Sequence, residues 1–494
     1  MAKRSYDAIV VGAGFGGAAC ASLLAKRGLE VLLLEKNAKA GGKAMAFSKR
    51  GFTYTPWVVI TAPINDNAFE IVLRELGMEG EVELVTPDSG GGAVYKNTRG
   101  QYMPMPKMPP GAVMDANAIF DWLEVEGEEA RTVALTALTE ITLMPAADID
   151  ALSDISFAEF LTRYDLPKSV YAYLVGSIHD ACFVAPVDAV AASEAITTLQ
   201  MIFLRSGGLF AKGGIGRVAE TYARAVEDNG GKVIMRARVE KITVESGRVT
   251  GVITDKGRFE APIVISNAGI QPTVLKLIGE EHFDRSYVNY VKELVPSWGL
   301  PGVRYFLDKE VIPTAFGTIF SDDSYWTLER FLEANEGNMP DDIAVLYEVP
   351  SNYDENAAPE GKQIVLAAVW GPAEGQATAK DMKPWWDKCD EIMFKVFPEL
   401  PEHIEHKECY SVRDVSVLTR DRVLPNQGGE CIGLGQVVGQ GGLRKPSIKA
   451  PIQGLFYVGC DAGGDGVGTQ QATRSGIKVA GAVKKYHLMH HAMK

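Results

Sequence analysis

The first part of the chain alternates between two patterns of apolar residues. Residues 6–11 become continuously apolar and β-branched toward their end, which is typical of a parallel strand buried on both faces. Residues 15–27 are rich in alanine and leucine and are followed by Gly28, the residue type that most often ends a helix. A second apolar run over residues 30–34 predicts another strand. The chain therefore opens on a β-α-β unit.

Similar patterns place further elements along the chain. Residues 218–228 have the composition of a helix, and a tight turn at residues 245–248 joins two of the short strands that follow it. The predicted strands lie near residues 232–235, 237–244, 249–254, 303–307, 343–348, 363–370 and 454–459, and further helices near residues 156–164 and 382–397. Strands and helices thus recur along the whole chain, as in an α/β protein.

Composition limits the class of protein and its partners. With 494 residues the chain exceeds one ordinary core, so we expect two domains, and its 46% hydrophobic and 23% charged residues are ordinary for a globular protein. The formal charge of −13 disfavours nucleic acid as a partner. The six cysteines form no CxxC pair, so we expect neither a disulfide framework nor a metal site.

Apolar segments long enough to cross a membrane are absent from the sequence. No uninterrupted apolar stretch approaches the length of about 20 residues that spans a bilayer. The N-terminal apolar run contains glycines and is followed by no cleavage site of a signal peptide. We therefore expect a cytoplasmic protein and leave a peripheral membrane contact open.

Three glycines directly follow the first predicted strand in the spacing GxGxxG. Gly12 permits the tight turn, Gly14 lets the backbone approach a diphosphate, and Gly17 lets the helix lie close to the strand. The amides at the start of this helix would face the diphosphate. The second strand ends at Glu35, 18 residues past Gly17, where a carboxylate accepts the hydroxyls of an unphosphorylated ribose. The unit therefore predicts a dinucleotide site.

Two further glycine-rich loops favour FAD over NAD. Gly41 and Gly42 follow closely behind Glu35 and precede Lys43, so backbone could approach a second part of an extended dinucleotide. Residues 460–468 form another glycine-rich loop between a strand and a helix, a usual cradle for an anion or a cofactor. We therefore expect FAD as the cofactor.

These motifs together resemble those of a known group of proteins, the phytoene desaturase-like branch of the amine oxidase and carotenoid desaturase superfamily of flavoproteins. The matching segments, in chain order, are residues 11–17, 35, 41–43, 212–216, 230–233, 239–242, 264–268, 454–459 and 475–476. The resemblance implies an α/β fold in which a Rossmann-like FAD-binding domain, of the glutathione reductase and amine oxidase type, is interleaved with an α+β substrate domain.

Each of the two domains would be assembled from separate stretches of the chain. We expect the FAD-binding domain to comprise residues 1–104, 196–284 and 415–494, and the substrate domain to comprise residues 105–195, which are mostly helical, and 285–414. Neither an internal repeat nor a low-complexity linker interrupts this arrangement.

The motifs and the resemblance identify the residues expected to bind FAD. The resemblance places the backbone of Val239 at the adenine and Asp461 at the ribityl or diphosphate part, although Asp461 is equally suited to cap a helix. Residues 51–57 normally run beside the flavin ring, and here they end in Trp57 where relatives have small residues. The predicted set is Gly12, Gly14, Phe15, Gly16, Gly17, Glu35, Lys36, Gly41, Gly42, Lys43, Val239, Asn267, Ala268, Gly459, Asp461, Gly468 and Thr469.

Few catalytic side chains are required, because a flavin carries the redox step itself. We expect a proton shuttle at His179 and Asp180, because an imidazole beside a carboxylate titrates near neutral pH. A surface histidine beside a helix-capping aspartate is the alternative. Tyr410 and Arg413 are further candidates to face the flavin. The sequence has no GxSxG, no HExxH and no second nicotinamide fingerprint, which disfavours hydrolases, metalloproteases and disulfide reductases.

We therefore expect an FAD-dependent oxidoreductase that adds or removes hydrogen across a carbon–carbon bond of a hydrophobic, isoprenoid- or carotenoid-like substrate. Its expected partners are this small molecule and an electron acceptor such as a quinone, oxygen or a redox protein. A flavin amine oxidase of the same fold, a redox-neutral isomerase that uses reduced FAD, and a flavin-bearing protein without catalysis remain the alternatives.

Overall fold

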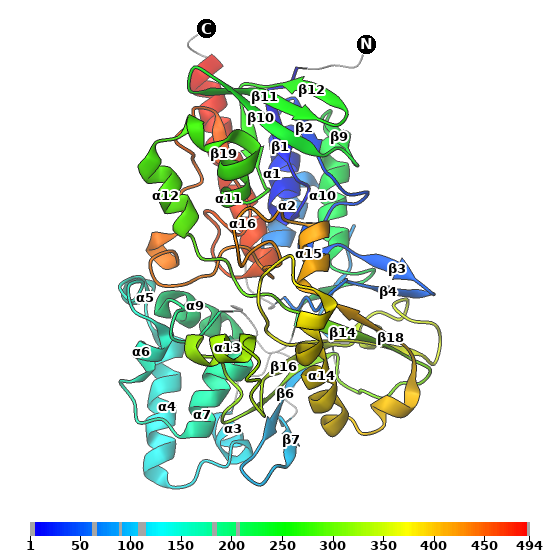
Figure 1. Ribbon diagram of the computed structural model, residues 1–494, viewed down its shortest axis with the longest axis vertical. Helices are drawn as coiled ribbons and strands as arrows, with labels where there is room; N and C mark the ends of the chain where they lie inside the picture. The colour runs from blue at the N-terminus through cyan, green and yellow to red at the C-terminus, as the bar shows by residue number, and fades with distance from the viewer. Residues whose placement is uncertain are drawn as a thin grey trace.

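The computed structural model describes residues 5–61, 67–87, 91–106, 115–179, 185–203 and 208–491. The chain forms two packed halves, one built around a five-stranded parallel sheet and the other around a seven-stranded mixed sheet (Figure 1). The chain passes between the halves several times, so each half contains segments that lie far apart in the sequence.

The five-stranded sheet joins strands from the beginning, middle and end of the chain. Its order is β19, β13, β1, β2, β9, and every neighbouring pair is parallel. β1, β2 and β13 are buried at every position, which agrees with the continuous apolar runs of the sequence. The strands are β1 (Ala8–Val11), β2 (Val31–Leu34), β9 (Lys232–Ile234), β13 (Val264–Ser266) and β19 (Leu455–Tyr457).

Different elements cover the two faces of this sheet. Alternate strand residues such as Val10 and Leu33 pack on helices, and their neighbours such as Ile9 and Leu32 pack on a small antiparallel sheet. The helices are α1 (Phe15–Lys26), α2 (Ala68–Leu76), α10 (Gly216–Asp228) and α16 (Gly468–His491). The antiparallel sheet consists of β10 (Val239–Glu245), β11 (Arg248–Thr254) and β12 (Gly257–Glu260). This layered arrangement confirms the predicted α/β, Rossmann-like half.

The seven-stranded sheet has the order β18, β14, β17, β16, β15, β6, β7. β15 pairs in parallel with β6, and the other neighbouring strands are antiparallel. Residues 91–104 pair in this sheet, although the sequence assigned them to the FAD-binding domain. The strands are β6 (Gly91–Lys96), β7 (Tyr102–Pro104), β14 (Gly302–Leu307), β15 (Phe316–Ser321), β16 (Val345–Glu348), β17 (Gln363–Ala368) and β18 (Ile404–Tyr410).

Helices pack beside this sheet and complete the second half, as Figure 1 shows in its lower part. They are α3 (Ala116–Trp122), α4 (Glu128–Leu143), α5 (Ala146–Asp150), α6 (Phe157–Leu161), α7 (Lys168–Ala172), the π-helix η2 (Tyr173–His179), α9 (Ala192–Phe203), α13 (Leu328–Asn335) and α14 (Ala379–Val396). None of the described helices combines the length and the apolar character needed to cross a membrane.

Further short elements complete the two halves. They are β3 (Phe47–Lys49), β4 (Phe52–Tyr54), β5 (Leu84–Val85), β8 (Phe210–Ala211), α11 (Ile270–Pro272), α12 (Arg285–Glu293), α15 (Val412–Leu418), and the short helices η1 (Gly42–Ala44), η3 (Thr273–Ile278), η4 (Glu280–His282), η5 (Pro350–Asn352), η6 (Leu400–His403) and η7 (Gly442–Arg444).

Candidate functional site

A cavity of about 330 Å³ lies where the two halves meet. Its wall contains the loops that follow β1, β2, β13 and β19, the strands of the first half. In parallel sheets, ligands bind at this carboxyl edge of the strands. The second half contributes residues of α9 and β16 to the same wall. The cavity is therefore shared by both halves.

Glycine backbone forms part of this wall. Gly12 has a φ of +95°, which favours glycine at the turn after β1. A Cβ on Gly14 would lie 2.7 Å from the Asn267 carboxamide, and one on Gly16 would lie 2.9 Å from the backbone of the loop after β19. A Cβ on Gly17 would overlap the carbonyl oxygen of Gly12, so this glycine packs the helix against the strand. Gly12 and Gly17 thus have the steric roles that the sequence predicts, and the approach of a diphosphate to Gly14 stays a prediction.

The N-terminus of α1 opens beside these glycines. Gly14 is its N-cap, and in the described chain no side chain caps the helix and no acidic residue lies in its first turn. The loop after β2 approaches from the other side, where the Gly41 N–H donates to Ala13 O at 2.9 Å. A Cβ on Gly42 would lie 3.2 Å from Gly14 Cα. The helix start is therefore suited to an anion such as a diphosphate, which needs close backbone approach.

Glu35 lies at one end of the cavity, directly after β2. Its side chain is only 5% exposed, and its two carboxylate oxygens accept hydrogen bonds from the N–H groups of Ala13 at 2.7 Å and Asn37 at 2.8 Å. Burial raises the pKa of Glu35, and these two N–H groups offset only part of that effect. Each oxygen keeps a second lone pair, so the carboxylate can still accept from a hydroxyl group.

Residues 417–421, which we call the strap, comprise the end of α15 and the loop after it, and residues 418–421 line the cavity. The side chains of Asn37 and Lys36 donate to carbonyl oxygens of the strap at 2.7 and 3.3 Å. Burial alone would raise the pKa of Asp421, but its cationic neighbours hold it below its usual value. These neighbours are Lys276 at 2.6 Å, Arg238 at 3.1 Å and Lys36 at 3.7 Å. The strap is thus fastened to three separate segments of the first half.

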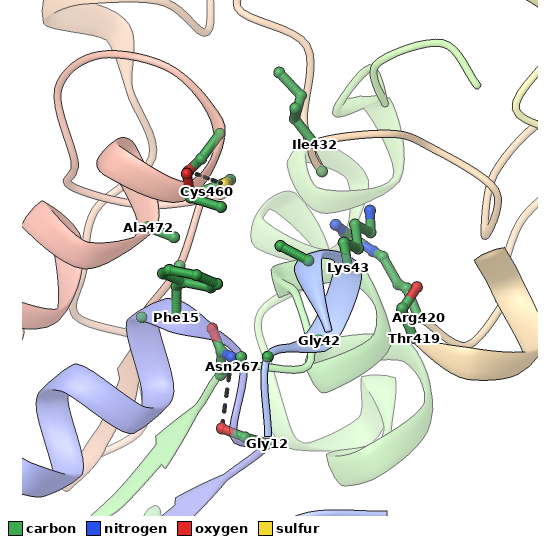
Figure 2. A pocket seen from close by; sticks show the side chains of 18 of the residues that line it. Gly12, Phe15, Gly42, Lys43, Asn267, Thr419, Arg420, Ile432, Cys460 and Ala472 are labelled. Carbon is green, nitrogen blue, oxygen red and sulfur yellow. Dashed lines mark hydrogen bonds between the residues drawn. The ribbon is translucent and has the colours of Figure 1, made fainter. Parts of the chain in front are cut away.

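A buried cluster of charges lies farther along the cavity. Arg420 donates to both carboxylate oxygens of Asp461, at 2.9 and 2.8 Å, and its Nε lies 2.7 Å from the Glu430 carboxylate. Burial alone would raise the pKa of Asp461, but the guanidinium and two backbone N–H groups hold it low. Lys43 donates to the Glu430 carbonyl oxygen, and burial lowers the pKa of this amine. Figure 2 shows Lys43 and Arg420 side by side, across the pocket from Phe15.

The second half supplies an apolar section of the wall. Residues 57–61, between β4 and α2, line the cavity with Trp57 at their start. Trp57 is only 3% exposed, so its ring is part of the packed wall and not of the surface. Four residues of the second half lie on the same wall, namely Thr198, Met201, Leu300 and Leu346. This section can accommodate an apolar molecule.

The predicted FAD residues gather around this one cavity. All of them line it apart from Gly17, whose packing role is described above. Asp461 lines the cavity, and its carboxylate is bound to Arg420 and to the N–H groups of Ile270 and Leu434. It therefore shapes the wall through these contacts and does not act as a helix N-cap in this structure.

The predicted catalytic residues lie elsewhere or outside the described residues. Tyr410 is buried at the end of β18, with Arg304 over its ring at 5.1 Å, and burial raises its pKa strongly. Arg413 is exposed on α15, and neither residue belongs to the described cavity wall. The backbone of His179 ends η2, and Asp180 lies outside the described residues. The proton shuttle at this pair remains a prediction.

Several residues of the site carry no signal in the sequence. Met201 and Leu346 are ordinary apolar residues of a helix and a strand, and only the packing of the two halves places them at the cavity. Arg420 and Glu430 lie close to Asp461 in space but not in the sequence. Their only signal in the sequence would have been an apolar face of a helix or strand with no assigned partner, or a charged residue within a predicted loop.

Comparison with known proteins identifies the family. The chain matches the family of flavin containing amine oxidoreductases over residues 15–484. It belongs to this family. The phytoene desaturase-like resemblance predicted from the sequence is confirmed by relatives with matching names.

Two relatives and one solved structure are similar to this chain. A chloroplastic prolycopene isomerase of Daucus carota is 25% identical over 97% of this chain and 80% of its own length. A lycopene-forming phytoene desaturase of Pantoea ananas is 24% identical over 80% of this chain and 81% of its own. A double mutant of putrescine oxidase has a similar fold, with a TM-score of 0.70 and 16% identity over 98% of this chain and 100% of that one.

Proposed function

We propose that FAD is the flavin that this family member binds. Three observations support an extended dinucleotide: the glycine wall that a Cβ would fill, the uncapped start of α1, and the buried Glu35 carboxylate. In this arrangement α1 would receive the diphosphate, Glu35 the adenosine ribose, and the strap would cover that end. The apolar wall would be left for the flavin ring and a substrate.

We propose further that the enzyme adds or removes hydrogen across a carbon–carbon bond of a hydrophobic, isoprenoid-like molecule. The observation that carries this proposal is the apolar wall formed by residues 57–61, Met201, Leu300 and Leu346. When bound, the flavin supplies a hydride acceptor or donor at N5. The protein then needs to hold the carbon–carbon bond against the ring and to exclude water, and apolar side chains do both.

The charges of the wall argue against an amine as the substrate. Three acidic residues belong to the described wall, and each already has partners. Glu35 receives two backbone N–H groups, Asp421 has three cationic neighbours, and Asp461 is paired with Arg420. A protonated amine would lose its hydration without gaining a carboxylate from the described part of the wall, which is strongly unfavourable in an apolar site.

Two candidate reactions differ in whether they need an electron acceptor. An enzyme that removes hydrogen passes electrons on to a quinone, to oxygen or to a redox protein, and we propose an acceptor of this kind. A redox-neutral isomerase that uses reduced FAD is the second candidate, which the relative named prolycopene isomerase favours. A dehydrogenation leaves the flavin reduced until an acceptor reoxidises it, whereas an isomerisation returns the flavin to its starting redox state.

Flavin reduction with a panel of compounds tests the proposal. The purified protein would be mixed with polyenes, enones, quinols and amines, with and without oxygen, while the flavin absorbance is followed. We expect a polyene or quinol to reduce the oxidised flavin, or an enone to reoxidise flavin that dithionite has first reduced under nitrogen, and amines to leave the oxidised flavin unchanged. Reduction by an amine with release of peroxide would instead establish an amine oxidase.

A variant of the wall makes the same test specific for the site. Met201→Lys places a charge on the apolar section, so exchange with apolar compounds should fall by at least about tenfold while FAD stays bound. Leu332→Lys on α13 is the matched control, because Leu332 is exposed and does not line the cavity. Equal activity of both variants would place the substrate elsewhere.

A further inference from the structure

A buried acid lies behind the apolar wall, in a place that the proposed reaction does not use. Glu348 is the last residue of β16, two positions beyond Leu346, which lines the cavity. Alternate residues of a strand share a face, so both side chains lie on the same face of β16. The Glu348 side chain is only 1% exposed.

Two hydrogen bonds hold this carboxylate. One oxygen accepts the backbone N–H of Val59 at 2.8 Å, and the other accepts the hydroxyl of Tyr353 at 2.7 Å. The Tyr353 ring is itself held by stacking on Phe210, with ring centroids 4.2 Å apart. Val59 belongs to the cavity wall, so Glu348 connects the rigid sheet of the second half to that wall.

The wall segment, residues 57–61, is fastened at both ends by other contacts. At its start Arg304 donates to the Pro56 carbonyl oxygen. At its end the Thr61 hydroxyl lies 3.1 Å from the Thr469 hydroxyl, and the Leu209 N–H donates to Thr61 O at 2.5 Å. The Val59 N–H lies midway between these anchors and donates to Glu348, while the Thr55 hydroxyl donates to the Trp57 carbonyl oxygen at 2.7 Å nearer the start of the segment.

We propose that Glu348 is a positioning residue: through the Val59 amide it sets the place of the Trp57–Thr61 wall against which the substrate binds. That the bound molecule is the substrate rests on the function proposed above, whereas the control of the wall by Glu348 does not. The carboxyl acts on the reaction through the wall, because Glu348 itself is not a cavity-lining residue.

The same geometry makes the wall sensitive to pH. Burial raises the pKa of Glu348 to about 7, and the Val59 N–H and the Tyr353 hydroxyl lower it only in part. Tyr353, with Asp354 beside it, is the titratable group that faces the carboxyl, and residues 57–61 contribute none. In the described chain no cation pairs with Glu348. Ionisation therefore leaves a buried negative charge. This charge strengthens the hydrogen bonds from the Val59 N–H and the Tyr353 hydroxyl, and it pulls the wall segment toward Glu348 through Val59.

Fluorine NMR of the holoprotein measures this coupling without any substrate. Tryptophan would be replaced by 5-fluorotryptophan, and Trp57→Phe would assign the resonance of the wall. In the wild-type protein we expect the Trp57 resonance to titrate with a midpoint near pH 7. Trp370 is fully buried beyond the end of β17 and does not line the cavity, so its resonance serves as the internal control.

Two substitutions decide whether Glu348 is responsible. Glu348→Gln cannot ionise, so the titration of Trp57 should disappear; its amide oxygen can accept the Val59 N–H while its NH2 donates to the Tyr353 hydroxyl oxygen. Tyr353→Phe removes one donor to the carboxylate, so the midpoint should rise by at least about half a pH unit. A Trp57 titration that persists in Glu348→Gln, or that keeps its midpoint in Tyr353→Phe, would overturn the proposal. If Glu348→Gln fails to fold, the Tyr353→Phe midpoint alone gives the answer.

Discussion

Arg420 and Asp461 form a buried ion pair in which two N–H groups of the guanidinium meet the two carboxylate oxygens, at 2.9 and 2.8 Å. Arg420 belongs to the strap that follows α15, and Asp461 follows β19, so the pair joins two separate parts of the cavity wall. Both side chains are less than a tenth exposed. The pair therefore holds these two parts of the cavity wall together.

Removal of one partner of this pair should destabilise the protein strongly. Asp461→Asn leaves the buried Arg420 guanidinium with Glu430 as its remaining carboxylate partner. A change of this kind lowers the free energy of unfolding by about 3 kcal/mol or more. Urea unfolding at a fixed FAD concentration measures it. Asp154→Asn is the matched control, because the Asp154–Arg444 pair is exposed and should contribute nothing measurable. Equal midpoints for both variants would contradict the prediction.

The glycine wall predicts a loss of cofactor on substitution. A Cβ on Gly14 would lie 2.7 Å from the Asn267 carboxamide, and a larger side chain at this turn would occupy the space of the diphosphate. Gly14→Val should therefore be purified without colour. Gly481→Ala on α16 is the control, since a Cβ there meets nothing within 4 Å. Flavin content per protein, from absorbance after denaturation, compares the two; a yellow Gly14→Val protein would refute the assignment.

The strap should slow the release of the cofactor. Asp421→Asn removes the charge that three cationic side chains share, and partly exposed ion pairs of this kind contribute about 1 kcal/mol together. We expect FAD to dissociate about fivefold faster from the variant. Because salt screens such pairs, raising the ionic strength should accelerate release from the wild-type protein more than from Asp421→Asn. Fluorescence recovery of the released flavin measures both rates, and an equal salt effect would count against the strap.

The buried Glu348 carboxyl predicts how stability varies with pH. Its pKa is about 7 in the folded protein against an ordinary value of 4.5, so the unfolded chain loses the proton first as the pH rises. The stability of the wild-type protein should fall by about 3 kcal/mol between pH 4.5 and 7 relative to Glu348→Gln, and the difference should then stay constant. Urea titrations of the two proteins over this range test it. If the free energy of unfolding varied with pH in the same way for both proteins, the pKa of the Glu348 carboxyl would not be raised.

The opening β-α-β unit was predictable because all of its signals are local. Four signals follow one another within residues 6–35, namely the apolar run, the GxGxxG glycines, the helix and Glu35. Each of them is determined by residues that are close to it in the sequence. The helix ends at Lys26, one residue before the predicted end, as is usual for a frayed last turn. The predicted strand at residues 343–348 likewise became β16, Val345–Glu348.

The rest of the site depends on contacts between distant parts of the chain. The apolar pattern of β16 predicts a strand but not that its last side chain meets the Val59 amide. The pairing of Arg420 with Asp461 requires the end of the chain to return beside α15. Tyr410 and Arg413 precede the last predicted strand, but this position in the sequence does not determine where their side chains point. Local patterns thus predict elements, and tertiary packing alone decides which of them face the cavity.

The last prediction concerns the electron donor and follows from the glycines at residues 213–216. The sequence places them before a helix, as in a nucleotide site, but the structure gives them another role. A Cβ on Gly216 would lie 2.8 Å from the Ala44 carbonyl oxygen, and one on Gly214 would lie 3.0 Å from the Ala46 side chain. These glycines therefore accommodate the loop that follows Gly41 and Gly42, and they are not available to approach a second dinucleotide.

NADH and NADPH should accordingly reduce the flavin slowly or not at all, whereas an apolar substrate or quinol should exchange electrons with it readily. Stopped-flow absorbance under nitrogen measures the bleaching of the flavin by each compound. Dithionite serves as the control, because it shows that the bound flavin can be reduced under the same conditions. Rapid bleaching whose rate reaches a plateau with rising NADPH concentration would mean that a nicotinamide site exists outside the Gly12 to Glu35 unit. It would favour a reductase that adds hydrogen to a carbon–carbon double bond of its substrate.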